Sequence, residues 1–325
     1  MNDIFNIEVN LKNYNKFSHN SIISTNIPSN INLCLWYLNT ECNYKCPFCG
    51  CSNQIKNEII RTPHEIENAF NKHGKQWIIF LTSLGEPFLY PKFLEIIKIL
   101  TKNNYITINS NLSHPNVYSL PSYANLDKLI AVHAAYHVIE IEKNDPEQIK
   151  KNDFIKKINF LQNNGINTVV SYVAYPPLLK RIENDFNLLR SKGIKNIMAK
   201  PFRGMYQNKN YPKSYSKKEW ALLIEISNSI NEVDFLDLAD NYKNYLCDAG
   251  YRSFFLDQKG DLFRCRSDSQ KIGNFFSDEI LFSNKTCICG MDKQNCLFAC
   301  VLSSMHANEG IANNLSLWRK IFKNY

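Results

Sequence analysis

Residues 31–51 read INLCLWYLNTECNYKCPFCGC, an apolar run followed at once by a group of cysteines. The run from Ile31 to Leu38 is short, mostly apolar and rich in aromatics, the pattern of a strand that is buried on both faces. Cys42, Cys46 and Cys49 then follow with the spacing C-x3-C-x2-C. The stretch predicts a first strand whose carboxyl end carries a loop of three thiols.

Beyond this loop, strand and helix patterns mostly alternate. Thr62-Pro63-His64-Glu65 offers an N-cap hydroxyl, a proline at the first helical position and a Glu three residues after the cap, which predicts a capping box. Helices are expected from there to about 73 and at 91–102, 147–163 and 179–191, and strands at 77–82, 105–110, 129–133, 168–173 and 196–200. About six parallel strands joined by helices predict an α/β fold with its chemistry at the carboxyl ends of the strands.

The pattern divides the chain into three parts. Residues 1–30 are polar and Asn-rich and are expected to form an N-terminal arm, 31–240 the core, and 241–325 a Cys-rich domain. A connector at 201–216 and a helix from about 217 to 230 precede the boundary. Within the last part, a turn at Lys259-Gly260-Asp261 predicts a β-hairpin that brings Cys247 and Cys265 together.

Composition limits the class of protein. Hydrophobic residues make up 44% of the 325, enough for a sizeable core, and no run of about 18 apolar residues predicts a membrane span. The formal net charge is +8, but the lysines are scattered, so a nucleic-acid partner is not expected. We expect a cytoplasmic protein, and there eleven cysteines indicate metal binding rather than disulfides.

The spacing of the triplet points to one kind of metal centre. Three thiolates on a cubane of four irons leave one iron open for another ligand. A zinc site or a set of buried thiols is the alternative, but zinc usually takes four protein ligands in paired clusters, and Cys51 lies only two residues beyond the triplet. We interpret Cys34 and Cys51 as small buried residues.

With Phe48 before its last cysteine and a strand before its first, the triplet resembles the signature of the radical S-adenosylmethionine (SAM) superfamily. The resemblance implies a partial (β/α)6 TIM-like barrel and a [4Fe-4S] cluster on Cys42, Cys46 and Cys49 whose open iron binds the amino and carboxylate groups of SAM. It also implies a flavodoxin- or ferredoxin-type reductant.

Two further stretches strengthen the resemblance. Ser83-Leu84-Gly85-Glu86-Pro87 follows the second strand and is similar to the family's G-G-E-P motif, with Leu84 in place of the first Gly. The motif implies that Gly85, Glu86 and Pro87 contact SAM, with Glu86 on the methionine ammonium. Ser110-Asn111 stands where the family often has Thr-Asn-Gly, with Leu112 in place of Gly, and these side chains are expected to reach the ribose or carboxylate of SAM.

The C-terminal cysteines carry a second resemblance. Cys247-Asp-Ala-Gly250, the Gly260 to Cys265 spacing and the last C-x3-C are similar to SPASM and Twitch extensions, which hold auxiliary [4Fe-4S] clusters. A full SPASM domain has seven cysteines, whereas this region has six, with C-x-C where C-x2-C is usual. At least one auxiliary cluster is implied, and a zinc knuckle is the alternative. The expected metal ligands in this region are Cys247, Cys265, Cys287, Cys289, Cys296 and Cys300.

By resemblance, the enzyme cleaves SAM reductively and a 5′-deoxyadenosyl radical abstracts hydrogen from a substrate. We expect oxidation or rearrangement of a small metabolite or short peptide, since the 41 residues before Cys42 are too few for a leader-peptide-binding domain. A peptide or protein maturase is the alternative, and an iron-sulfur electron carrier is the non-enzyme alternative. Candidate substrate contacts near the strand ends are His133, Tyr136, His137, Tyr175, Arg203 and Tyr206.

Overall fold

The computed structural model describes residues 31–49, 59–74, 76–226, 246–247, 249–266, 268, 270–285 and 287–288. Its strands are β1 (Asn32–Tyr37), β2 (Trp77–Thr82), β3 (Tyr105–Ser110), β4 (Leu129–Ala135), β5 (Thr168–Ala174), β6 (Ile197–Pro201), β7 (Gly204–Tyr206), β8 (Lys209–Tyr211), β9 (Leu246–Cys247), β10 (Ser253–Leu256), β11 (Asp261–Phe263), β12 (Lys271–Asn274) and β13 (Cys287–Ile288).

The described helices are α2 (Pro63–Lys72), α3 (Phe93–Asn103), α4 (Leu120–Tyr123), α5 (Val138–Glu142), α6 (Ile149–Asn163), α7 (Ile182–Ser191) and α8 (Lys217–Ile226). Short 3-10 turns lie at η1 (Pro87–Leu89), η2 (Pro115–Ser119) and η3 (Pro176–Leu178). The described part of the chain contains no helix that is both long and apolar enough to cross a membrane.

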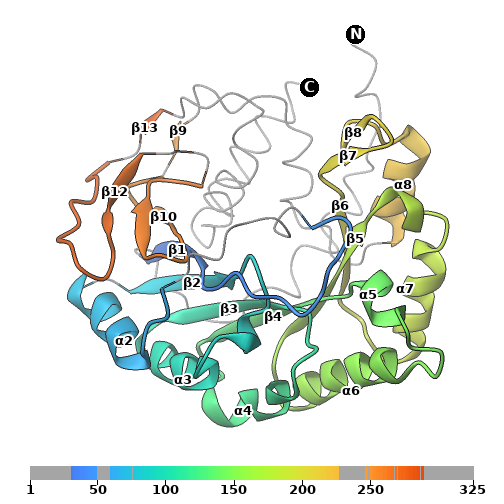
Figure 1. Cartoon of the computed structure of the whole chain (residues 1–325), viewed down its shortest axis with the longest axis horizontal. Helices are drawn as coiled ribbons and strands as arrows, with labels where there is room; N and C mark the ends of the chain where they lie inside the picture. The colour runs from blue at the N-terminus through green and yellow to red at the C-terminus, as the bar shows by residue number, and fades with distance from the viewer. Residues whose placement is uncertain are drawn as a thin grey trace, which may run out of the picture.

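The central element is a sheet with strand order β12-β11-β10-β1-β2-β3-β4-β5-β6. Strands β1 to β6 are parallel and follow one another in chain order, as expected for successive right-handed β-α-β units. Figure 1 shows the sheet as a curved wall with α2, α3, α4 and α6 along its outer side. The predicted α/β fold with an open, partial barrel is confirmed.

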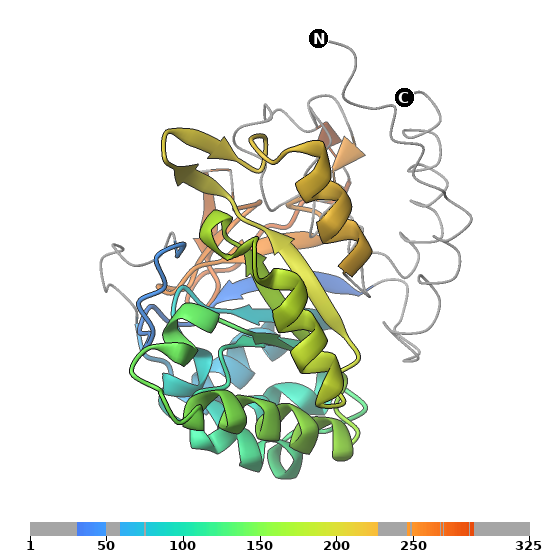
Figure 2. The same cartoon turned by 90° about the vertical axis from the view of Figure 1, so that its right-hand side faces the viewer.

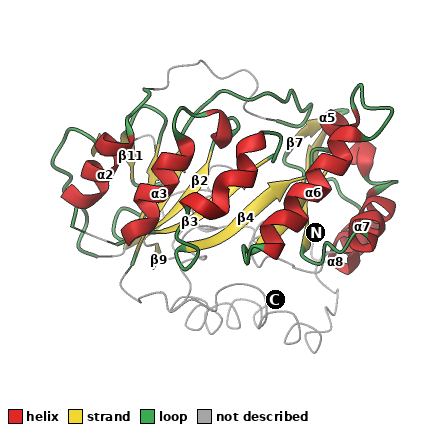
Figure 3. Ribbon diagram, turned by 90° about the horizontal axis from the view of Figure 1, so that it is seen from below, coloured by secondary structure: helices red, strands yellow, loops and turns green. Residues whose placement is uncertain are grey.

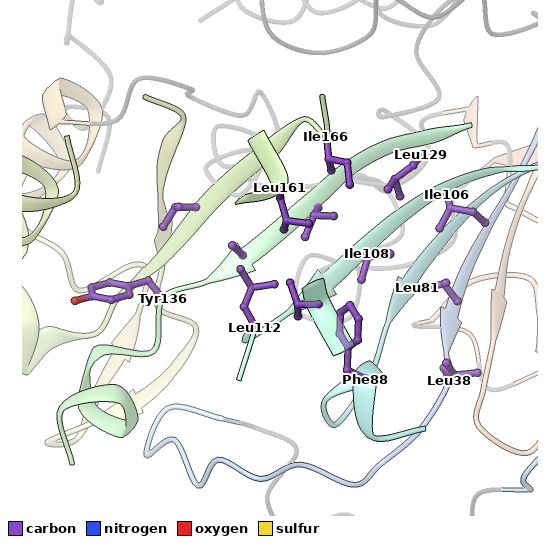
Figure 4. Packing of buried hydrophobic residues seen from close by; sticks show 14 of the residues in the cluster. Leu38, Leu81, Phe88, Ile106, Ile108, Leu112, Leu129, Tyr136, Leu161 and Ile166 are labelled. Atoms are coloured by element: carbon purple, nitrogen blue, oxygen red, sulfur yellow. The ribbon is translucent and has the colours of Figure 1, made fainter. Parts of the chain in front are cut away.

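The two faces of the sheet pack differently. Alternate residues of β1, such as Cys34 and Trp36, join the main core with helix residues such as Ile66 and Ile96. Figure 3 shows these helices lying across the strands, and Figure 4 shows side chains of this core, from strands, helices and loops. The opposite, concave face carries smaller apolar clusters made of residues on or near the strands, including Leu33 and Leu35.

The predicted capping box at the start of α2 is confirmed. The Thr62 side chain accepts the Glu65 N–H at 3.2 Å, and the Glu65 carboxylate accepts the Thr62 N–H at 2.7 Å. Three other helices begin later than predicted, and one of them is α7, which begins at 182 rather than 179. Lys92 (φ 58°) and Gln148 (φ 56°) are left-handed, so α3 begins at 93 rather than 91, and α6 at 149 rather than 147.

The predicted connector at 201–216 contains a β-hairpin that the sequence pattern did not predict. Strands β7 and β8 pair with each other around Gln207 and Asn208, which both have positive φ. Hairpin turns of this kind usually contain Asn-Gly or Asp-Gly, and neither is present. Figure 2 shows this hairpin projecting beyond the end of β6.

The C-terminal hairpin is confirmed, and it joins the main sheet. Strands β10 and β11 are antiparallel, and Gly260 (φ +89°) supplies the left-handed residue of the turn between them. Strand β10 also pairs in parallel with β1, on the side away from β2. The predicted domain boundary near 240 lies outside the described residues and stays a prediction.

We predict that Thr62→Ala lowers the free energy of unfolding by about 1 kcal/mol, because it removes the N-cap acceptor of α2. Urea denaturation followed by circular dichroism measures the change. Thr62→Ser keeps the hydroxyl and is expected to match wild type. Equal stability of the Ala and Ser variants would contradict the importance of the capping box.

Candidate functional site

The three cysteines of the triplet lie in the loop that leaves the carboxyl end of β1. Cys42 and Cys49 are exposed, while Cys46 is 7% exposed. The Cys49 N–H donates to the Cys46 carbonyl at 3.0 Å, which closes a tight turn through Pro47 and Phe48. Burial, and next the neighbouring Cys49 thiol, raise the pKa of Cys46 to about 12. A cation bound here would therefore have to displace the proton of this thiol.

The cysteine loop is fixed to the turn that follows β2. The Glu86 N–H donates to the Glu41 carbonyl at 2.7 Å, one residue before Cys42. A Cβ on Gly85 would lie 1.9 Å from the same carbonyl oxygen, so only glycine permits this approach. The Asn39 amide donates to the carbonyls of Glu41 at 3.2 Å and Glu86 at 3.0 Å. Gly85 is thus required by the position of the cysteine loop.

The Glu86 carboxylate is buried and accepts several hydrogen bonds. The Ser110 hydroxyl donates to it at 2.6 Å, the Asn111 N–H at 2.7 Å and the Phe88 N–H at 3.2 Å. Burial raises the pKa of Glu86 to about 7, even though these donors favour the ionised form. The structure therefore brings together Glu86, Ser110 and Asn111, which the sequence assigned to one site, and Pro87 starts the short η1 turn behind them.

A second link joins the loop after β3 to the cysteine loop. The Asn111 side-chain amide donates to the Asn43 side-chain oxygen at 3.1 Å, and the Asn43 side-chain amide donates to the Ser113 hydroxyl at 2.7 Å. Asn43 lies between the first two cysteines of the triplet. The ends of β1, β2 and β3 thus form one hydrogen-bonded edge. No sequence pattern indicated the role of Asn39 or Asn43.

Both departures from the family motifs have local explanations. Leu84 lies on the concave face in contact with Leu35 and Tyr37, and its φ is not positive, so a side chain is accommodated there. Leu112 has a φ of 54°, the conformation that glycine adopts at least strain, and its side chain is buried in the core. Burial of the leucine side chain offsets the strain of its backbone.

Three of the six candidate substrate contacts, His137, Tyr175 and Tyr206, form a group of rings with Phe48 of the cysteine loop. The His137 and Tyr175 rings each lie 5.5 Å from the Phe48 ring, and Tyr206 lies 5.3 Å from Tyr175. His133 is on the concave face of β4, and Arg203 follows β6 in a partly buried position. The prediction for Tyr136 is wrong, because this residue is buried in the core against Phe154 and Tyr172, on the helix side of the sheet.

The concave face is polar near the carboxyl ends of β4 and β6. The Nδ1 atoms of His133 and His137 are buried without a hydrogen-bond partner in the described part of the chain. Burial, and then the Lys200 ammonium, lower the pKa of His133 to about 3 and that of His137 to about 4. Sequence reasoning missed Lys200; its signal is a lysine inside the otherwise apolar run of β6.

Strand pairing brings together two of the C-terminal cysteines. Cys247 and Cys287 are directly opposite in the antiparallel pair β9–β13, and Cys265 is buried after β11. Gly250 (φ +85°) lies against the Arg264 side chain, which holds the segment after Cys247 beside the one that leads to Cys265. The predicted ligands Cys289, Cys296 and Cys300 lie outside the described residues, as does Cys51.

Comparison with known proteins agrees with this geometry. Residues 36–142 match the family model described as the Radical SAM superfamily. No curated protein matches the chain in sequence. The structure resembles Streptococcus suis SuiB bound to S-adenosylmethionine, with a TM-score of 0.54, 16% identity and alignment over 83% of this chain and 66% of SuiB. The chain thus spans slightly less than two thirds of SuiB.

The same fold is found in two further solved structures. SuiB bound to the precursor peptide SuiA aligns with a TM-score of 0.54 and 16% identity over 83% of this chain and 65% of that one. The anSMEcpe enzyme with bound AdoMet and Kp18Cys peptide aligns with a TM-score of 0.55 and 14% identity over 76% and 78%. Residues 36–142, which include the cysteine loop, are thus similar to the Radical SAM superfamily, and the chain shares the fold of these solved structures.

The residues present fit the cofactors of this class. Three thiols project from one short loop, and Gly85 leaves room for close backbone approach beside them. The Asn39 Oδ1 and Ser83 Oγ atoms, at the ends of β1 and β2, are buried without a hydrogen-bond partner in the described segments. Among the described residues, no three His, Cys, Asp or Glu side chains converge as closely as a single metal ion requires. The donor set suits a thiolate-bound cluster with a polar ligand beside it.

We predict that Gly85→Ala displaces the cysteine loop, because its Cβ would overlap the Glu41 carbonyl. After anaerobic reconstitution the variant is expected to hold about four fewer irons per chain than wild type. Gly193→Ala places a Cβ at a left-handed glycine with open space around it and should keep its iron. Full iron content in Gly85→Ala would show that the contact is not required.

Proposed function

We propose that this chain is a radical SAM enzyme. Its cluster, when bound, supplies the electron that cleaves SAM to methionine and a 5′-deoxyadenosyl radical, which abstracts a hydrogen atom from the substrate. The observation that carries the proposal is the docking of the cysteine loop onto the Gly85–Glu86 turn and the β3 loop. One edge of the sheet thereby carries both the expected cluster ligands and the expected SAM contacts.

Each residue of this edge has a specific part in the proposal. Cys42, Cys46 and Cys49 hold the [4Fe-4S] cluster, and SAM binds beside it. The Glu86 carboxylate accepts the methionine ammonium, while Gly85 and Pro87 shape the turn. Ser110 and Asn111 hold Glu86 and face the ribose or carboxylate of SAM.

An auxiliary [4Fe-4S] cluster near the C-terminus is part of the proposal. The register of Cys247 and Cys287 and the burial of Cys265 support it. Cys247, Cys265 and Cys300 would be three of its ligands, and the fourth would come from Cys287, Cys289 or Cys296. Such a cluster could accept the electron left on a substrate radical or bind the substrate directly. Whether the enzyme oxidises or rearranges its substrate depends on which of these two roles the auxiliary cluster has.

The substrate is proposed to enter along the polar part of the concave face near the carboxyl ends of β4 and β6. Its neighbours there would be His133, His137 and Tyr175, with Arg203 and Tyr206 further out. SuiB and anSMEcpe have been solved with peptides bound, which favours a peptide as the substrate. A small metabolite would contact the same residues. We further propose a flavodoxin- or ferredoxin-type reductant and a cytoplasmic location.

We predict that the reconstituted, reduced wild-type protein converts SAM to 5′-deoxyadenosine, measured by liquid chromatography. Cys46→Ala should form none, because it removes one cluster ligand. Cys34→Ala is the matched control, since that cysteine is fully buried in the helix-side core. Cluster-loaded wild type that forms no 5′-deoxyadenosine would favour an electron carrier over an enzyme.

We predict that SAM binding strengthens as the pH rises. The pKa of Glu86 is raised to about 7, so the carboxylate ionises between pH 6.0 and 7.5 and its attraction for an ammonium increases over that range. An increase in affinity of roughly fivefold is expected in wild type, measured by titration calorimetry. Glu86→Gln should remove most of this dependence, and an unchanged slope in that variant would exclude Glu86 as the titrating group.

A further inference from the structure

Helix α6 buries a lysine beneath the loop that follows β3. The Lys157 side chain is 3% exposed, and its ammonium donates to the Ser113 carbonyl at 3.1 Å and to the Asp153 carboxylate at 2.5 Å. It also lies 5.8 Å from the Tyr118 ring, whose hydroxyl donates to Asp153 at 3.3 Å. The Lys157 ammonium is therefore bound both by a surface carboxylate and by a backbone carbonyl of this loop.

The Ser113 carbonyl belongs to the loop that reaches the proposed cofactor site. The Ser113 N–H donates to the Asn111 side-chain oxygen at 2.9 Å, and the Ser113 hydroxyl accepts from Asn43 of the cysteine loop. The Asn111 N–H in turn donates to the Glu86 carboxylate. A chain of three hydrogen bonds thus links Lys157 to Glu86. The positive charge of Lys157 also lowers the pKa of Glu86, although burial raises that pKa by more.

Stability alone does not account for this lysine. Burial of an ammonium is costly, and a buried ion pair is often no more stabilising than an apolar residue of similar size. Its partner carboxylate, Asp153, is 43% exposed, so solvent weakens the attraction between the two groups. An unbranched apolar side chain would fill the same space, but it could not donate to the Ser113 carbonyl.

We propose that Lys157 is a positioning residue that anchors the Asn111–Ser113 loop and so holds the Glu86 carboxylate in place for the SAM ammonium. The inference rests on the proposed function, because it acts through the proposed SAM contacts. Lys157 touches neither the cluster nor SAM. Its effect is expected on SAM affinity rather than on iron content.

The test uses the reconstituted holoenzyme, with SAM affinity from titration calorimetry, iron content and thermal unfolding measured on each variant. Lys157→Met should bind SAM about tenfold more weakly, with wild-type iron content and no loss of thermal stability. Lys157→Arg, which keeps the donors, should restore most of the affinity. In an Asn111→Ala background, Lys157→Met should have little further effect, because both changes act through the same loop.

Two control variants separate this role from an ordinary ion pair. Lys151→Met removes another buried lysine of α6, which pairs with Glu142 at 3.4 Å, and should leave SAM affinity unchanged. Asp153→Asn breaks the ion pair but leaves the bond to the Ser113 carbonyl, so it should lower thermal stability and leave SAM affinity near wild type. Lys157→Gln is a second variant, expected to weaken SAM binding as Lys157→Met does.

The outcomes distinguish failure of the proposed function from failure of the role proposed for Lys157. If wild type does not bind SAM, the proposed function fails. If wild type and Lys151→Met bind SAM and Lys157→Met binds it equally well, the role of Lys157 is overturned while the proposed function stands. Loss of iron or of folding in both Lys157→Met and Lys157→Gln would make Lys157 a folding residue and would also overturn the inference.

Discussion

The arrangement of the site depends on one backbone hydrogen bond, from the Glu86 N–H to the Glu41 carbonyl. It joins the loop after β1 to the turn after β2, and it can form at this distance only because Gly85 has no side chain. Asn39 strengthens it by donating to both carbonyl groups. With this contact in place, the cysteines next to Glu41 and the carboxylate of Glu86 are held at the same edge of the sheet.

The parallel sheet supplies the setting for that contact. Strands β1, β2 and β3 are neighbours in chain order, so the loops at their carboxyl ends emerge side by side. The helices on the outer face provide most of the described core. Burial also adjusts the chemistry: it raises the pKa of Glu86 and lowers those of His133 and His137.

Much of this arrangement could be predicted from local sequence. Apolar runs and the Thr62 capping box located strands and a helix start, and the cysteine spacing with Gly85 and Glu86 indicated the site. Contacts between distant segments could not be predicted in this way. The pairing of β10 with β1 and the Asn43–Asn111 link depend on tertiary structure, and Tyr136 was misplaced because the side of the sheet it faces is set by packing.

The most direct test of the account is the iron and sulfide content of anaerobically reconstituted protein, combined with electron paramagnetic resonance of the reduced clusters with and without SAM. Wild type is compared with a Cys42→Ala/Cys46→Ala/Cys49→Ala variant. The account predicts about eight irons in wild type, about four in the variant, and a spectrum that SAM perturbs only in wild type. A variant that keeps every iron, or zinc in place of iron, would contradict it.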